Sequence, residues 1–199
     1  MTDNLEHHSP RWIRTHYTLY HAFLELIHDY NPEDITVSSV THKAGIHRKT
    51  FYLHYSNIDE LFEEHIHTLL STYSARIMKL PLPYDYFQLS EIMFDFYTSS
   101  PEIEKIFTHP RYRALADRFT IEAMKDNRAR YNPYRNFTDA EQELINTFVV
   151  YSSANVWRRW ALSGKKVPMK RAVEILGHLL EHGVEDLRAT YSNTADNTD

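Results

Sequence analysis

The backbone of this chain has few places to turn, because only 4 of its 199 residues are glycine and 8 are proline. A fold of many short strands needs frequent turns, whereas long helices need few. Apolar residues recur at spacings of three and four, which is the period of an amphipathic helix, and no convincing strand alternation interrupts them. The sequence therefore predicts an all-α fold of about nine helices.

Capping residues, prolines and glycines mark the ends of these helices. Ser9 is placed as an N-cap with Pro10 in the first helical position, and Asn31-Pro32 ends that first helix. Gly45 separates two short helices, and Pro81 marks a hinge after a long one. The helices are expected over residues 10–29, 37–44, 47–54, 58–80, 84–97, 101–107, 111–131, 138–162 and 168–191.

Composition excludes several classes of protein. The absence of cysteine rules out disulfides and thiolate metal sites. No apolar run approaches the roughly 18 residues of a membrane span, and the polar N-terminus does not resemble a signal peptide, so a cytoplasmic location is expected. The sequence shows no catalytic nucleophile paired with a base, no glycine-rich loop that could bind a phosphate, and no pair of catalytic carboxylates. We therefore expect a protein that is not an enzyme and has no cofactor.

The charge of the chain restricts how it could bind a polyanion. The formal net charge is −5, and residues 1–60 contain five Lys and Arg against eight Asp and Glu. A global basic signature of nucleic-acid binding is absent. Any such surface must therefore be a local patch.

The most informative stretch runs from Ile35 to Leu61 and reads ITVSSVTHKAGIHRKTFYLHYSNIDEL. Its apolar residues are spaced to hold two short helices together, and its second short helix presents polar and basic side chains outward. This is the arrangement of a helix-turn-helix, whose second helix enters the major groove of DNA. The alternative is an ordinary helical hairpin within a bundle. The apolar residues are Ile35, Val40, Ala44, Ile46 and Phe51.

The outward side chains of this motif divide into two groups. Arg48, Lys49 and Thr50 can contact base edges in the major groove, because guanidinium, ammonium and hydroxyl groups match the groups displayed there. Hydroxyl groups and helix-start amides in the same stretch can bind phosphates. The complete set expected to contact DNA is Thr36, His47, Arg48, Lys49, Thr50, Tyr52, His54, Tyr55 and Ser56.

This stretch resembles the TetR (tetracycline-repressor-like) family of transcriptional regulators. The resemblance rests on the run from Ile35 to Val37, the run from Ala44 to Ile46, Thr50-Phe51-Tyr52 with Tyr55, and Asp59-Glu60-Leu61. It implies a ligand-responsive repressor that binds a palindromic operator as a dimer. It also implies a helix-turn-helix DNA-binding domain over residues 1–57 and a helical ligand-binding and dimerisation domain over residues 58–191. The tail over 192–199 is expected to be disordered because it is polar throughout.

The second half of the chain adds a further resemblance and two candidate sites. Val156-Trp157, Trp160 and Ser163-Gly164 resemble the subgroup that contains regulators of dihydroxyacetone kinase operons. A surplus of aromatic residues in the middle of the chain can line an effector cavity, although core packing is the plainer interpretation for most of them. The candidate ligand-binding residues are Phe94, Tyr97, Tyr112, Phe119 and Asn155.

The last two predicted helices carry wide apolar faces, and two such helices from each subunit would form a four-helix bundle. A homodimer is therefore expected, with Phe148, Tyr151, Val156, Leu176, Leu180 and Val184 in its interface. His178 and His182 lie four residues apart, a spacing that can bind a metal. No third ligand can be nominated from the sequence, so they are interpreted as surface or interface histidines, with no metal site.

One departure from the family pattern leaves the function open. Family members often place lysines in the loop before the fourth helix, where they meet the DNA backbone, whereas this chain has Ser56, Asn57 and Ile58. With fewer cations in this loop, fewer phosphates are neutralised, so the salt-dependent part of the DNA affinity is weaker. The alternative is a coactivator on the same fold that acts through a protein partner without an operator, and a more distant one is a ligand carrier.

Overall fold

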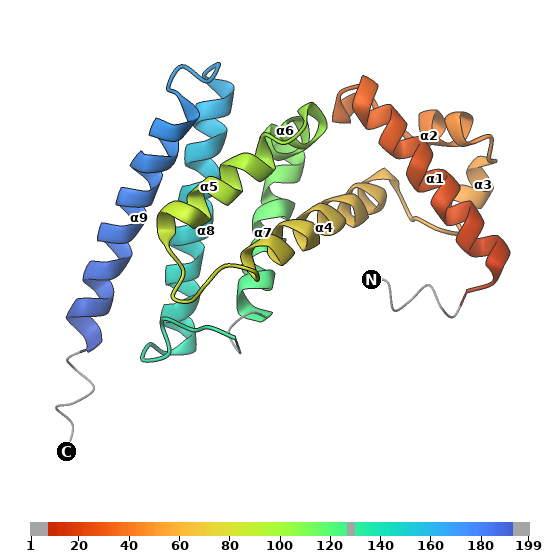
Figure 1. The fold of residues 1–199 in the computed structure, drawn as a ribbon. Coiled ribbons are helices and arrows are strands. Elements are labelled where there is room, and N and C mark those ends of the chain that lie inside the picture. The colour runs from red at the N-terminus through yellow and green to blue at the C-terminus, as the bar shows by residue number, and fades with distance from the viewer. Residues whose placement is uncertain (1–7, 127–129, 193–199) are drawn as a thin grey trace. The chain divides into compact units, whose positions relative to one another are not determined.

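The computed structural model describes residues 8–126 and 130–192, with the backbone alone at 126 and 184–192. Within these residues the chain forms nine α-helices and one short 3-10 helix, and no strand (Figure 1). None of the described helices has the length and apolar character needed to cross a membrane. The helices are α1 (Pro10–Asp29), α2 (Val37–Ala44), α3 (Arg48–Phe51), α4 (Ile58–Ile77), α5 (Tyr86–Tyr97), α6 (Pro101–Thr108), α7 (Pro110–Asp126), α8 (Asp139–Leu162) and α9 (Met169–Ser192).

The all-α prediction is confirmed, and most boundaries agree with it to within a few residues. Ser9 caps α1 by accepting a hydrogen bond from the Trp12 amide at 3.3 Å. The prediction missed the 3-10 helix over Pro32–Asp34 and made three helices too long, since the one expected over 111–131 ends at Asp126. The third helix ends at Phe51 and continues only as turns, and α4 ends at Ile77 before the proline break. The predicted tail lies outside the described residues, apart from Ser192, which ends α9.

Contacts divide the chain into two compact units, residues 1–66 and 67–199. The division falls inside α4, later than the boundary expected at 57/58 and earlier than the hinge expected at Pro81. The reason is that the first turns of α4 belong to the core of the N-terminal unit. Leu61, Phe62 and Ile66 are fully buried there, and the Phe62 ring meets Phe23 of α1 edge-on at 4.7 Å. What each unit does remains a prediction.

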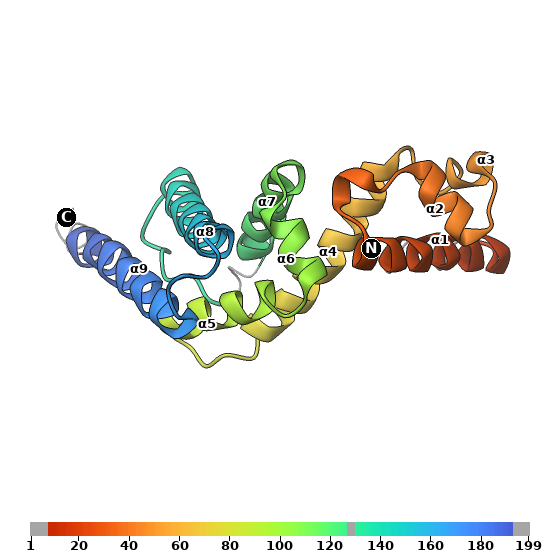
Figure 2. The ribbon, with the colours of Figure 1, turned by 90° about the horizontal axis from the view of Figure 1, so that it is seen from above.

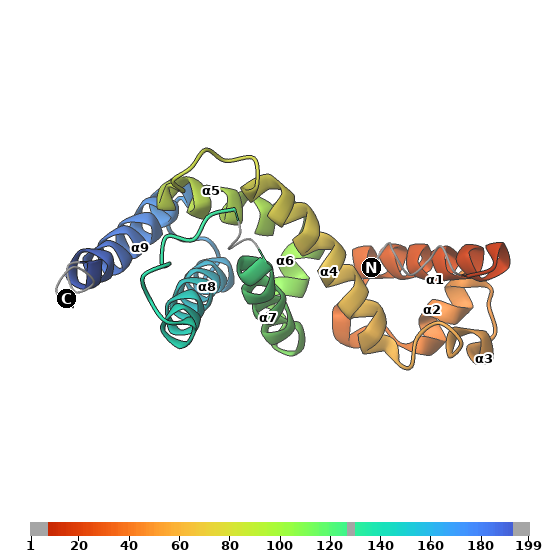
Figure 3. The same ribbon diagram turned by 90° about the horizontal axis from the view of Figure 1, so that it is seen from below.

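The N-terminal unit packs α1 against α2 and α2 against α3 (Figure 3). Its core contains three of the apolar residues expected to join the short helices, since Ile35, Val40 and Phe51 are all buried. Ala44 and Ile46 are half-buried. The apolar pattern of the motif therefore predicted correctly how these helices are held together.

In the C-terminal unit, α9 packs along α5, and α8 packs against α6, α7 and α9 (Figure 2). Gly177 permits the close approach of α9 to α5. A Cβ atom at this position would lie 2.5 Å from the ring of Phe87, well inside van der Waals contact. Leu176 and Leu180 flank this contact and are buried within their own chain.

A buried ion pair fixes three helices of this unit to one another. Arg158 of α8 donates to both oxygens of Asp117 on α7, at 2.6 and 3.2 Å. The same guanidinium donates to the carbonyl oxygens of Phe107, at the end of α6, and Arg113 in α7. Both charged side chains are more than nine-tenths buried. The donors of Arg158 are taken up by this network.

Removing one partner of this pair should destabilise the protein strongly. We expect Asp117→Ala to lower the free energy of unfolding by about 3–5 kcal/mol, because it leaves an uncompensated buried guanidinium. The matched control is Glu104→Ala, which breaks the more exposed pair between Glu104 and Lys165 and should cost less than about 1 kcal/mol. Urea denaturation followed by circular dichroism measures both. Equal losses in the two variants would contradict this account.

A second buried polar network lies in the N-terminal unit. His65 of α4 is 8% exposed and its Nδ1 lies 2.9 Å from the Tyr20 hydroxyl of α1. Phe23 covers the same imidazole edge-on at 5.5 Å. Burial lowers the pKa of His65 to about 4, and the nearby charge of Glu64 opposes this only in part. His65 is therefore neutral in the folded protein at neutral pH.

The stability of the protein should fall on mild acidification because of His65. An unfolded histidine takes up a proton near pH 6.5, whereas folded His65 does so near pH 4. Between these values the unfolded state binds more protons, so stability present above pH 6.5 is lost as the pH falls. We expect His65 to account for about 2 kcal/mol of lost stability between pH 7 and pH 5.

Urea denaturation at the two pH values tests this. The His65→Gln variant should show a correspondingly flatter dependence on pH. His21→Gln changes an exposed histidine of α1 and should keep the steep dependence. A steep dependence retained in His65→Gln would count against the assignment.

Candidate nucleic-acid interface and effector cavity

A capping box begins α2, and a glycine ends it before the turn into α3. Thr36 and Ser39 form a reciprocal capping box, in which the Ser39 amide donates to the Thr36 hydroxyl at 3.1 Å and the Thr36 amide donates to the Ser39 hydroxyl at 2.8 Å. Gly45 ends α2 with φ 65°, a left-handed conformation that favours glycine. The chain then enters α3 with its N-terminus at His47.

The exposed face of α3 carries most of the residues expected to contact DNA. His47, Arg48 and Lys49 are exposed, and Thr50 is half-buried beside them. The Arg48 guanidinium donates to the hydroxyl of Tyr52, one turn later, at 3.2 Å. This places a cation, a hydrogen-bonding hydroxyl and a second cation within one turn of a short helix.

Tyr55 does not belong to this face, which corrects the expectation that it binds phosphate. It is 3% exposed, and its hydroxyl donates to a carboxylate oxygen of Glu64 at 3.0 Å. The His16 ring stacks on Tyr55 and lies 3.0 Å from the other Glu64 oxygen. Burial first, and the Glu64 charge second, raise the pKa of Tyr55. Its role is to join α4 to α1.

His54 also packs away from the exposed face of α3, against α1. Its ring lies 4.4 Å from that of Trp12 on α1, and burial lowers its pKa, helped by the nearby His16. A neutral, half-buried imidazole adds no cation to the surface. The aromatic spacing within α1 gave no sign of this contact, because Trp12 and His54 are distant in sequence.

The loop before α4 is occupied by acidic and amide side chains. The carboxylate of Glu60 accepts a hydrogen bond from the Ser56 amide, and the Asn57 side chain caps α4 by accepting from the Glu60 amide at 3.1 Å. The Ser56 amide, expected to help bind phosphate, already has an anionic partner. Because a carboxylate repels a phosphate, this loop contributes less to anion binding than a lysine-containing loop would.

A cavity of about 190 Å³ lies in the C-terminal unit. It is bounded by α4, α5, α7, α8 and α9 and by the segment over 131–134. A dry engineered cavity of about 150 Å³ holds benzene, so this space suits a molecule slightly larger than a single ring. The residues at its wall include Leu70, Tyr73, Ile77, Tyr86, Ser90, Met93, Tyr97, Thr120, Met124, Tyr134, Asn146, Val150, Ser153, Ala154 and Leu180.

Among the described residues, none that lines this cavity has a charged or histidine side chain. Its polar groups are hydroxyls and amides, and burial raises the pKa of Tyr73 and of Tyr97, which keeps both phenols neutral. Ser90 is 2% exposed, and its hydroxyl has no hydrogen-bond partner among the described residues. A charged ligand would lose its hydration here without compensation, whereas a neutral one with a hydrogen-bonding group would fit.

Of the five residues expected to bind the effector, Tyr97 lines this cavity. Phe94 packs against Trp160 in the core, Tyr112 is buried beside His109, and Phe119 contacts His67. Asn155 is exposed and accepts a weak hydrogen bond from Arg158. The sequence identified the aromatic surplus but not which side chains share a space, because these come from five helices and one connecting segment.

The apolar face of α8 is exposed, as a dimer interface requires. Leu144, Phe148 and Tyr151 have exposed fractions of 72%, 50% and 39%. On α9, however, the exposed apolar residues are Ile175 and Leu179. Leu176 and Leu180, named as interface residues, face the interior of their own chain, Val156 is half-buried, and the side chain of Val184 lies outside those described. The sequence pattern could not tell which side of α9 turns inward.

Comparison of the fold with solved structures gives consistent matches at low sequence identity. A TetR-family regulator from Streptomyces coelicolor matches with a TM-score of 0.63 and 18% identity, over 89% of this chain and 83% of that one. A TetR regulator from Streptococcus agalactiae matches at 0.61 and 16%, over 85% and 95%. The dihydroxyacetone kinase operon activator DhaS matches at 0.50 and 17%, over 87% and 97%.

The sequence by itself gives no such match. No family model matches it, and no curated protein sequence matches it. The resemblance seen in the helix-turn-helix and the agreement across most of each matched structure nevertheless point the same way. In its all-helical architecture, the chain has the fold of the TetR-family transcriptional regulators.

Proposed function

We propose that this protein is a DNA-binding transcription regulator, a repressor that binds its operator as a homodimer and responds to a small uncharged effector. The observation that carries the proposal is the short helix α3, which follows a left-handed glycine turn and exposes His47, Arg48 and Lys49. Such a helix is shaped to enter the major groove. The neutral cavity in the other unit supports a ligand-dependent response.

The chemistry of the side chains on this surface suggests which of them contact bases and which contact phosphates. Lys49 and Thr50 are proposed to contact bases, whereas the hydroxyls of Tyr52 and Thr36 are proposed to bind the phosphates. Arg48 shares its guanidinium with Tyr52, so the two side chains act together. Tyr55 and His54 support the helix from behind and are no longer proposed as contacts.

Binding to duplexes drawn from the DNA flanking its own gene tests this assignment. We expect Lys49→Ala or Thr50→Ala to weaken binding to the specific duplex by about 1–3 kcal/mol and to reduce discrimination against a scrambled one. Tyr52→Phe should weaken binding to both duplexes about equally. The salt dependence should be shallow, because few cations meet the backbone and few counterions are released.

The matched control for Lys49 is Lys43→Ala. Lys43 is an exposed cation of the same unit, but its ammonium lies 2.8 Å from the Glu25 carboxylate, so its charge is already compensated. The control should leave binding nearly unchanged. If no duplex is bound specifically even at low salt, the DNA-binding proposal is wrong.

The effector is proposed to be uncharged and about the size of a substituted single ring. The wall of the cavity offers apolar surface together with neutral hydroxyl and amide groups, and the Ser90 hydroxyl is a buried group in need of a partner. A ligand that supplies that hydrogen bond satisfies a group that otherwise costs stability. Effector and DNA affinities are then linked if the effector favours the conformation that DNA does not.

Thermal unfolding in the presence of matched small molecules tests the cavity. Benzyl alcohol should raise the melting temperature, whereas benzoate of the same size should not, because its carboxylate would be buried without a partner. Ala154→Leu fills the cavity and should abolish the shift, while Ala114→Leu on the exposed face of α7 should not. Equal shifts with both molecules would contradict a charge-free site.

The dimer is proposed to form through the exposed apolar face of α8 and α9, defined by Leu144, Phe148, Tyr151, Ile175 and Leu179. Two helices from each subunit would cover these side chains in a four-helix bundle. This revises the earlier interface by replacing the buried Leu176 and Leu180. Paired recognition helices would then read the two halves of a palindromic operator.

Charge substitutions distinguish the exposed face from the core. Phe148→Glu or Leu179→Glu should give folded monomers, because each places a charge in a desolvated interface. Leu176→Glu should unfold the C-terminal unit instead, since Leu176 is 1% exposed within one chain. Light scattering together with circular dichroism separates the two outcomes. If light scattering shows that the unsubstituted protein is a monomer at micromolar concentration, the dimer proposal is wrong.

A coactivator that acts through a protein partner is the second candidate. The loop before α4 favours it, because Glu60 holds the Ser56 amide and no lysine stands there. In that case Lys49→Ala would affect binding of the partner and not of DNA. The duplex series described above decides between the two candidates.

A further inference from the structure

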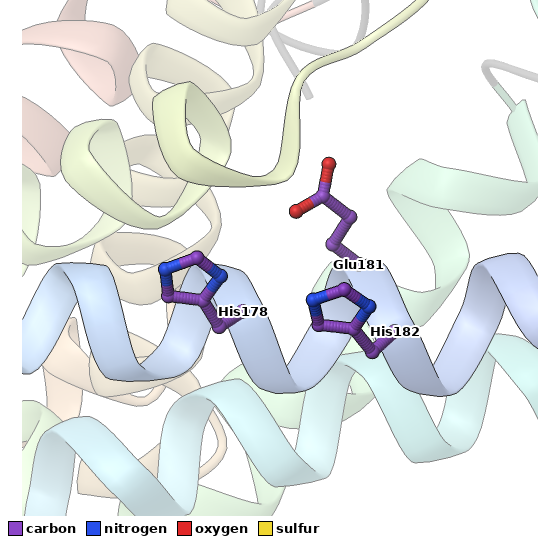
Figure 4. Close-up of side chains that lie close together, drawn as sticks. All are labelled: His178, Glu181 and His182. Atoms are coloured by element: carbon purple, nitrogen blue, oxygen red, sulfur yellow. The ribbon is translucent and has the colours of Figure 1, made fainter.

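Three potential metal ligands gather on the outer surface of α9. His178, Glu181 and His182 are all exposed, and each offers one ligand atom, with these atoms within 4.8 Å of one another. Figure 4 shows the three side chains projecting from the same stretch of helix. None of them lines the effector cavity. They form a group separate from α3 and from the cavity, on the same helix as Ile175 and Leu179 of the proposed dimer face.

The helix itself brings these residues together. With about 3.6 residues per turn, positions four apart lie above one another and a position three along lies beside them. The two imidazole rings are nearly parallel, with an interplanar angle of 6° and centroids 6.0 Å apart. Two nitrogens bound to one tetrahedral zinc ion at about 2.05 Å lie roughly 3.3 Å apart. Small rotations of exposed side chains reach this geometry from the present one.

The ring of His178 is held by a neighbouring helix. Phe87 of α5 meets it edge-on, with ring centroids 4.8 Å apart and an interplanar angle of 89°. This is the ring that also lies against Gly177, so His178 stands beside the contact between Gly177 and Phe87. A ligand whose orientation is set by packing loses less freedom when it binds an ion.

We propose that His178, Glu181 and His182 form a site for a late first-row transition ion, with Zn²⁺ as its best match. Two imidazoles and one carboxylate are donors that Zn²⁺ accepts, and they suit Mg²⁺ or Ca²⁺ poorly. Water completes the coordination, since the three side chains face outward. The bound ion joins two successive turns of α9 and stabilises the folded chain by mass action.

Titration of the full chain, free of any polyhistidine tag and previously treated with a chelator, tests the site. Calorimetry with ZnCl₂ should give one ion per chain, and His178→Ala with His182→Ala should weaken binding at least about tenfold, since even outer ligands matter this much. Glu181→Gln should weaken it less. Zn²⁺ should also raise the melting temperature of the unsubstituted chain, and MgCl₂ should do neither.

Two controls make the result specific. The pair His21→Ala and His28→Ala removes two exposed histidines of α1 and should leave zinc binding intact. The Phe148→Glu variant should still bind one ion per chain, because the site belongs to a single helix and does not depend on the dimer. The proposal would be overturned if the unsubstituted chain bound zinc no more tightly than the double variant of His178 and His182. It would also be overturned if Phe148→Glu lost zinc binding.

Discussion

A single buried guanidinium determines how the C-terminal unit is put together. Arg158 cannot be desolvated without an anion and acceptors for its remaining donors, and these come from two other helices, as Asp117 and Arg113 on α7 and Phe107 at the end of α6. The helices α6, α7 and α8 must therefore keep their mutual positions. The charge of Arg158 is neutralised by Asp117, and no charged side chain is among the described residues that line the cavity in the same unit.

The fold followed from features that are local in sequence. Helix periods, the Ser9 and Thr36 caps, and the turn at Gly45 each depend on residues within four positions of one another. They were predictable because helices are stabilised locally before they pack. The same reasoning failed where packing decides the outcome. The amphipathic pattern of α9 has apolar residues on both sides, so it could not say that Leu176 turns inward and Leu179 outward.

For the candidate DNA surface, too, the sequence predicted some residues correctly and others not. The exposed residues of α3 were predicted correctly because a short helix after a tight turn has one side that the core can cover. Tyr55 was assigned to phosphate because its hydroxyl stands next to the motif in sequence. Its burial depends on Glu64 and His16, which lie on two other helices and carry no local signature. Long-range polar contacts of this kind can be found only in three dimensions.

The contact between Gly177 and Phe87 limits how α9 can move. If α9 slid along α5 by one turn, Val173 or Glu181 would take the place of Gly177 and bring a side chain into the space that Phe87 occupies. Such a slide is therefore opposed by a steric clash, which a tilt of α9 about Gly177 would not create. A signal that passes between the cavity and the outer face of α9 would have to travel as a tilt or rotation of the helix, with Gly177 as its fulcrum.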